Sequence, residues 1–266
     1  MSGTTEIAHW KMNDDAATTV VVDAQGSHDG VAARNTDAFN SAGKVNGALD
    51  FNGTSDLSTT VSAAELNFTD GAGNDDPFSI CAWVNMDDAT GFRMLSKYDN
   101  GTVNMREYWV GTNAADKQVL QISDIDGDTI FMLADSAITG DQGSYIHLAF
   151  TYDGSNANTG MTLYRNGVAV AATGGSSGGA YGGMPSTAQV LLLGALDNSP
   201  GTIFGNGDID DVRIFDIELT LAQVGLIYNG GTGTETSLAV LEDQGESVGA
   251  YEHQPFASPY EVGAWR

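Results

Sequence analysis

Residues 77–86 read PFSICAWVNM and residues 145–152 read YIHLAFTY, and in both stretches apolar side chains recur at every second position. Successive side chains of a β-strand point to opposite faces of its sheet, so this alternation predicts strands with one face in a core. In the first strand that face carries Phe78, Ile80, Ala82, Val84 and Met86.

Turn signals separate further short strands on both sides of these two. Residues 161–170 read MTLYRNGVAV, and Asn166-Gly167 favours the positive φ angles of a type I′ hairpin turn. Residues 117–133 predict a second hairpin that turns at 124–128. One helix is predicted over residues 220–228, with Thr220 as its N-cap and residues 229–231 as its end. The pattern predicts an all-β, two-sheet antiparallel sandwich with one short C-terminal helix.

The composition excludes several classes of partner. The chain has 266 residues, enough for one large β-domain, and its 34 glycines suit many tight turns. Ten basic against 35 acidic residues give a formal charge of −25, which argues against nucleic acid and anionic membranes. The acidity serves solubility or a salty environment, or it supplies carboxylates for Ca²⁺. No apolar run approaches the ~20 residues of a membrane span.

The N-terminal residues and the single cysteine bear on the cellular compartment. Cys81 stands alone, so no intramolecular disulfide is possible. The opening residues MSGTTEIAHW lack the basic and apolar regions of a secretory signal. We therefore expect synthesis in a cytoplasm. Release would then take place within a particle, by lysis, or through a signal-independent exporter.

The strand pattern stops near residue 231, so we divide the chain into a sandwich domain, 1–231, and an extended arm, 232–266. The arm has no strand or helix period, but it contains four aromatic residues in its last part: Tyr251, Phe256, Tyr260 and Trp265. Such a segment cannot bury its own aromatic rings. It either folds back over its own sandwich or docks onto a neighbouring subunit.

Five segments in consistent order resemble laminin-G-like jelly rolls of the concanavalin A-like lectin/glucanase superfamily. They are residues 47–56 (GALDFNGTSD), 77–86, 145–154 (YIHLAFTYDG), 163–167 (LYRNG) and 205–215 (GNGDIDDVRIF). Tyr145 stands where the family usually has Trp. The resemblance covers about residues 7–230 and implies a jelly-roll sandwich that binds carbohydrate or protein, often with one structural calcium ion.

Catalytic patterns are absent from the sequence. A retaining glycosidase needs two carboxyl groups about 5–5.5 Å apart, which a strand supplies by close glutamate and aspartate spacing. The predicted strands 77–86, 106–112 and 145–152 offer Glu107 alone. The strings that fit G-x-S-x-G, in residues 174–179 (GGSSGG) and 245–249 (GESVG), do not lie between a predicted strand and a predicted helix as a nucleophile elbow does, and the four histidines are scattered along the chain. We expect no enzymatic activity.

Asp210 is the best candidate for a metal ligand. The resemblance implies that this aspartate holds Ca²⁺ with backbone carbonyls near Trp10 to Asn13 and at Gly53. The alternative is that Asp210 caps a loop by hydrogen bonds without a metal. Residues 124–128 (DIDGD) lack the sixth-position Gly and twelfth-position Glu of an EF-hand, so we interpret them as a hairpin turn.

Sugar recognition requires flat aromatic faces together with oriented polar groups. The candidates are Trp83, Tyr108, Trp109 and Arg106, the last because cations are so few. Trp83 points away from the face that carries Phe78. The alternative for each aromatic side chain is ordinary packing in the core.

These observations predict a non-enzymatic structural or adhesive protein of a larger assembly, such as a phage capsid decoration or tail/fibre protein. We expect other protein subunits as partners, with homo-oligomers, and a position on a virion or extracellular particle surface. The alternative is a free extracellular lectin-like module that binds a cell-surface glycan. A glycoside hydrolase is a remote alternative.

Overall fold

The computed structural model describes residues 6–60, 64–197 and 202–244, and most of these form two antiparallel sheets. Sheet A has the strand order β14-β13-β12-β7-β17-β5-β4, and β1 pairs with β17 beside this path. Its strands are β1 (Glu6–Trp10), β4 (Asn40–Ala42), β5 (Gly47–Asn52), β7 (Phe78–Asp88), β12 (Ile146–Tyr152), β13 (Met161–Arg165), β14 (Val168–Ala169) and β17 (Asn206–Phe215).

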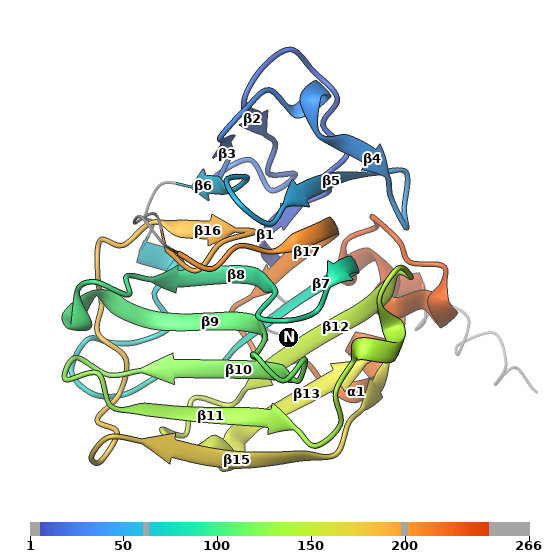
Figure 1. Cartoon of the computed structure of the whole chain (residues 1–266). Coiled ribbons are helices and arrows are strands. Elements are labelled where there is room, and N and C mark those ends of the chain that lie inside the picture. Colours follow the sequence, from blue (N-terminus) through green and yellow to red (C-terminus); the bar gives the residue numbers. More distant parts are fainter. Residues whose placement is uncertain (1–5, 61–63, 198–201, 245–266) are drawn as a thin grey trace, which may run out of the picture.

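Sheet B has the order β15-β11-β10-β9-β8-β16-β6-β3-β2 and forms the second layer (Figure 1). Its strands are β2 (Val20–Val21), β3 (Gly30–Ala32), β6 (Ser58–Thr60), β8 (Arg93–Tyr98), β9 (Arg106–Thr112), β10 (Gln118–Ser123), β11 (Thr129–Ala134), β15 (Ala172–Ser177) and β16 (Leu191–Leu193). The short 3₁₀ turns are η1 (Thr36–Ala38), η2 (Ala64–Leu66), η3 (Val103–Met105), η4 (Thr139–Asp141), η5 (Asn158–Gly160) and η6 (Asn229–Gly231).

The core lies between the sheets and uses the alternating side chains that the sequence indicated. Ile80 pairs with Phe150 and Ala82 with Leu148 across β7 and β12, and all four are fully buried. Sheet B faces them with the inward side chains of its central strands: Leu95, Tyr108, Val110, Leu120 and Ile122. The prediction of a two-sheet antiparallel sandwich is therefore confirmed.

Both predicted hairpins are present. Asn166 and Gly167 have φ angles of 50° and 76° and join β13 to β14. Residues 124–128 connect β10 to β11, and Asp124 Oδ1 accepts the backbone N–H groups of Asp126 and Asp128. The aspartate motif thus serves as a turn, as interpreted from the sequence.

The outer face of sheet A is covered by α1 (Leu221–Tyr228), the predicted helix. Thr220 caps its start in a reciprocal capping box with Gln223, and Asn229 ends it in the left-handed conformation. Val224 and Ile227 of the helix are buried against the outward side chains of the sheet, which include Cys81, Ala149 and Phe215.

The described part of the predicted arm, residues 232–244, also packs on sheet A. The buried Arg213 guanidinium donates hydrogen bonds to the backbone oxygens of Thr234 and Thr236. Leu238 is fully buried, and residues 238–244 form a second short helix. The sandwich therefore continues past residue 231, where the sequence pattern ended.

Four aromatic residues predicted to contact other subunits, Tyr251, Phe256, Tyr260 and Trp265, lie outside the described residues. Their role stays a prediction. Among the described helices, none has the length and apolar character needed to cross a bilayer.

Candidate functional site

Trp83, predicted to bind a ligand, is buried on the outer face of sheet A. It is 1% exposed and lies beneath the end of α1. Its ring stacks on Tyr228 at a centroid distance of 5.5 Å and lies 5.2 Å from His147. The prediction for Trp83 is corrected, because the helix covers the face that the sequence left free.

Tyr108 is also buried, but inside the core. Its ring lies 5.5 Å from that of Phe68 and 5.3 Å from that of Phe78. Its hydroxyl donates a hydrogen bond to the backbone oxygen of Leu66 at 3.0 Å. Tyr108 presents no surface to a ligand, so its predicted role is corrected as well.

Trp109 and Arg106 lie on β9, and both already contact neighbouring groups of the protein. The Arg93 guanidinium lies 3.9 Å from the centre of the Trp109 ring, which is 7% exposed. Arg106 lies over Tyr98 and donates to the backbone oxygens of Asp99 and Asn100. The structure therefore does not bring the four predicted ligand contacts together at one accessible site.

Asp210, the candidate metal ligand, is fully buried on β17. Its Oδ2 accepts the backbone N–H of Val45 at 2.8 Å, whereas its Oδ1 has no hydrogen-bond partner among the described residues. Burial, as the dominant cause, raises the pKa of this carboxyl to about 8. A buried carboxylate oxygen without a protein partner is a position that a cation or a water can satisfy.

The segments that the family resemblance implied as partners of Asp210 do not all lie together in the structure. Gly47 packs closely on Asn13 and lies near Gly43. Gly43 in turn lies close to the carboxylate, because a Cβ atom added to it would be 2.9 Å from Asp210 Oδ2. Gly53 instead packs on Asn206, four residues before Asp210 on the same strand. A calcium site here would therefore draw on Asp210 and the 43–47 and 10–13 segments, without Gly53.

The donor set fits Ca²⁺ only in part. One ionised carboxylate and nearby backbone carbonyls are oxygen ligands of the kind that Ca²⁺ prefers. Glu235, which also acts on Asp210 electrostatically, already accepts from Asn13 and Asn46. No cluster of three acidic, histidine or cysteine side chains suited to a metal occurs among the described residues.

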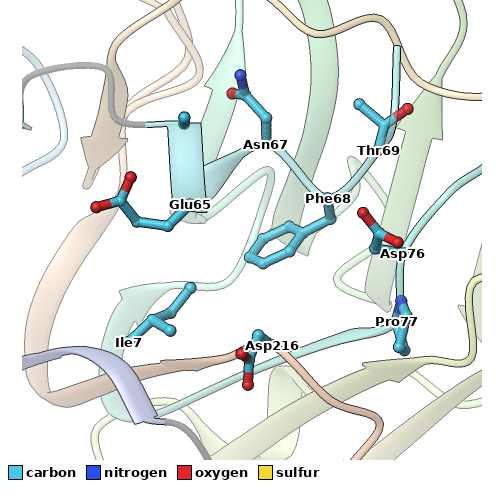
Figure 2. A pocket seen from close by; sticks show the side chains of 9 residues that line it. Ile7, Glu65, Asn67, Phe68, Thr69, Asp76, Pro77 and Asp216 are labelled. Atoms are coloured by element: carbon cyan, nitrogen blue, oxygen red, sulfur yellow. The ribbon is translucent and has the colours of Figure 1, made fainter. Parts of the chain in front are cut away.

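A pocket of about 450 Å³ opens at one end of the sandwich, and we call it the end pocket. It lies where β1 and β7 begin and β17 ends. These strands are antiparallel neighbours, so the three strand ends lie at the same end of sheet A. The loop that carries η2 forms its other wall. Its lining residues are Ile7, Ala64, Glu65, Asn67, Phe68, Thr69, Asp76, Pro77 and Asp216 (Figure 2).

The apolar part of the end pocket is fixed by the core. Phe68 is 2% exposed and stacks on Phe78 with a centroid distance of 4.5 Å and an interplanar angle of 13°. Figure 2 shows its ring directed toward the side of the pocket where Ile7 and Asp216 lie, with Asp76 on the opposite side. The ring therefore belongs to the core and forms the closed base of the end pocket, and it leaves little of its own surface to a bound molecule.

The polar groups of the end pocket come from the loop and from the strand ends. Asn67 donates to the Ser186 hydroxyl at 3.0 Å, and its Oδ1 has no partner among the described residues. Thr69 donates to the backbone oxygen of Met184 at 2.9 Å. Glu65, Asp76 and Asp216 add three solvent-exposed carboxylates.

Buried Asp75 holds the loop in place behind these groups. Its Oδ2 accepts the hydroxyls of Tyr152 and Tyr181, and its Oδ1 accepts the N–H of Met184. Three separate chain segments therefore meet at one carboxylate. This arrangement makes the wall of the end pocket a fixed structure, which suits recognition.

Sequence reasoning missed the end pocket because its residues carry no shared pattern. Asp76 and Asp216 are 140 positions apart, and only the pairing of β7 with β17 brings their strand ends together. The available signal was weak: Asp76 directly precedes one strand pattern, residues 77–86, and Asp216 directly follows another, residues 205–215.

The two packed antiparallel sheets form a jelly-roll sandwich, and the comparison with known families assigns this fold to one of them. Residues 52–225, more than half of the chain, match the laminin-G family model described as "Concanavalin A-like lectin/glucanases superfamily". The chain belongs to this family. No curated protein matches it.

Several solved structures share the fold. Domain 4 of AbnA, a GH43 extracellular arabinanase from Geobacillus stearothermophilus, in complex with arabinotriose, is 17% identical with a TM-score of 0.56. The match covers 88% of this chain and 100% of that domain. The botulinum neurotoxin serotype D ligand binding domain in complex with N-acetylneuraminic acid is 12% identical with a TM-score of 0.56. That match covers 85% of this chain and 50% of the toxin domain.

Proposed function

We propose that this protein is a non-catalytic carbohydrate-binding module that holds its ligand in the end pocket. This proposal rests on a pocket of about 450 Å³ in which the partly exposed side chains of Ile7 and Pro77 lie beside carboxylate groups. A pocket of this size lies within the range of small-molecule sites, about 300–1,000 Å³.

The chemistry of the lining suits a sugar. A pyranose or furanose ring has an apolar face of C–H groups, which pack well on apolar surfaces such as those of Ile7 and Pro77. Its hydroxyls need hydrogen-bond acceptors, and the exposed carboxylates of Asp76 and Asp216 can supply them. Two solved structures of this fold, the arabinanase domain and the serotype D toxin domain, contain bound saccharides, which supports the proposal.

A binding role without catalysis follows from the exposure of the pocket's carboxylates. A glycosidase needs an acid with a raised pKa, and burial in apolar surroundings is the usual cause. Glu65 is 56% exposed, and Asp76 and Asp216 are exposed as well. All three carboxylates are open to solvent, so each can accept a hydrogen bond from a ligand hydroxyl.

Glycan-array binding by the full chain tests the proposal. We expect a defined set of glycans to bind the wild-type protein and to lose binding in Ala64→Trp, which fills the end pocket without removing a polar group. Ala114→Trp makes the same change at an exposed position outside the lining and should bind as wild type does. A flat array with folded wild-type protein, or equal binding by Ala64→Trp, contradicts the proposal.

The assembly expected from the sequence rests on residues 251–265, outside the described ranges, so a position on a virion stays a prediction. A structural calcium ion at Asp210 is likewise proposed on its unpartnered Oδ1.

A further inference from the structure

We propose that this protein binds an oligosaccharide rather than a single sugar, with a second, uncharged subsite beside the end pocket. This inference rests on the proposed carbohydrate-binding function and specifies the length and the charge of its ligand. The second subsite is a pocket at the tip of the hairpin that residues 67–76 form, and we call it the tip pocket.

The tip pocket has a volume of about 320 Å³ and an uncharged lining. Its walls are residues 71–73, Ile125 and residues 182–185, none of which is acidic or basic. Ile125 is 57% exposed, so its apolar side chain is open to a ligand. An uncharged group with an apolar face suits these walls, as the C–H face of a neutral sugar ring does.

Two glycines leave the tip pocket open. Gly73 and Gly183 have φ angles of 99° and 94°, which residues with side chains rarely adopt. Their backbones are in contact, because a Cβ atom added to Gly183 would be 2.7 Å from the carbonyl group of Gly73. The two loops therefore meet backbone to backbone, and their closest contact carries no side chain that could fill the pocket.

Two buried aspartates fix the walls of the tip pocket relative to one another. Asp75, 7% exposed, belongs to the hairpin and accepts the backbone N–H of Met184 at 2.7 Å. Asp124, 3% exposed, accepts the backbone N–H of Gly182 at 3.0 Å and begins the turn that carries Ile125. All three walls are thus joined before a ligand arrives, and a preformed site loses less entropy on binding.

The two pockets lie along one hairpin. Thr69 and Asp76, at its base, line the end pocket, whereas residues 71–73 line the tip pocket. About three extended residues separate base from tip, or ~10 Å, so a ligand that reaches both pockets needs more than one sugar ring. Between them, exposed Asp70 and Asn74 hold each other by a 2.6 Å hydrogen bond and offer ordered polar groups to a passing chain.

A glycan array of neutral oligosaccharides tests the inference on the full chain. The probes are homo-oligomers of glucose, mannose, galactose, xylose and arabinose, with two to six units each. In at least one series, we expect affinity to rise roughly fivefold or more between two and six units. Ala72→Trp, which fills the tip pocket from an exposed lining position, should remove this rise and leave two-unit binding within about twofold. Ile125→Ser should weaken six-unit binding roughly threefold.

Ala114→Trp and Val168→Ser are the matched controls, because both positions are exposed and outside the two linings. They should bind as wild type does. The inference is overturned if affinity does not depend on length, or if Ala72→Trp binds six units as wild type does. It is also overturned if Ala72→Trp weakens two-unit and six-unit binding equally. When Ala64→Trp still abolishes binding in these cases, the carbohydrate function stands and only the tip pocket fails. A flat array with folded wild-type protein refutes both proposals.

Discussion

Replacing Asp210 with Asn should stabilise the calcium-free protein at pH 8 and not at pH 5. Burial raises the pKa of Asp210 from 3.8 to about 8 in the folded protein. Between about pH 4 and pH 8, the folded state therefore keeps a proton on the Asp210 carboxyl, whereas the unfolded state has lost it. Stability from this group is highest below pH 4 and falls as pH rises to 8.

The size of the effect follows from the shift. About four pKa units correspond to ~5 kcal/mol at pH 8, at 1.36 kcal/mol per unit. Asn keeps the oxygen that accepts the Val45 N–H, but it places an amide N–H₂ at the position of the unpartnered Oδ1. An unsatisfied buried donor costs about 1–3 kcal/mol. The net gain should be ~2–4 kcal/mol at pH 8 and near zero at pH 5.

Urea denaturation in EDTA at both pH values measures this difference. The same titration in the presence of Ca²⁺ separates the two roles of Asp210: Ca²⁺ at 100 times its Kd should stabilise the wild type by about 2.7 kcal/mol and leave Asp210→Asn unchanged. A variant that is less stable than wild type at pH 8 in EDTA refutes the argument from buried charge. Equal calcium responses remove Asp210 as a ligand.

Two further substitutions test the covering of sheet A. Arg213→Met leaves Asp211 and Glu6 without their buried cation and removes the hydrogen bonds to residues 234–236. We expect urea denaturation to show that the free energy of unfolding falls by about 3–5 kcal/mol. A fall below about 1 kcal/mol would contradict the stabilising role of Arg213. Trp83→Ala should cost about 3–5 kcal/mol while glycan affinity stays within twofold, and a selective loss of affinity would restore Trp83 as a ligand contact.

Much of the fold was predictable because its signals are local. Alternation in residues 77–86 and 145–152 fixes which side chains share a face, and one register places both sets in the core. Asn166-Gly167 determines its hairpin through the backbone angles that these residues tolerate. The Thr220 cap likewise depends only on residues within one helical turn.

The candidate site was not predictable, because it depends on contacts between distant segments. Alternation placed Trp83 on the face opposite Phe78, but it could not show that α1 and residues 232–238 cover that face. The packing of residues 232–238 was not predictable for the same reason: they have no period of their own and are held by Arg213 from another part of the chain. The end pocket needs the strand order of sheet A before its carboxylates meet.

A crystal structure of the protein with its best array glycan tests the central claim most directly. We predict a sugar ring in the end pocket against Ile7 and Pro77, with a hydroxyl in hydrogen-bond contact with Asp76. A glycan bound instead on the outer face of sheet B against Trp109, with the end pocket filled by solvent, would contradict the account.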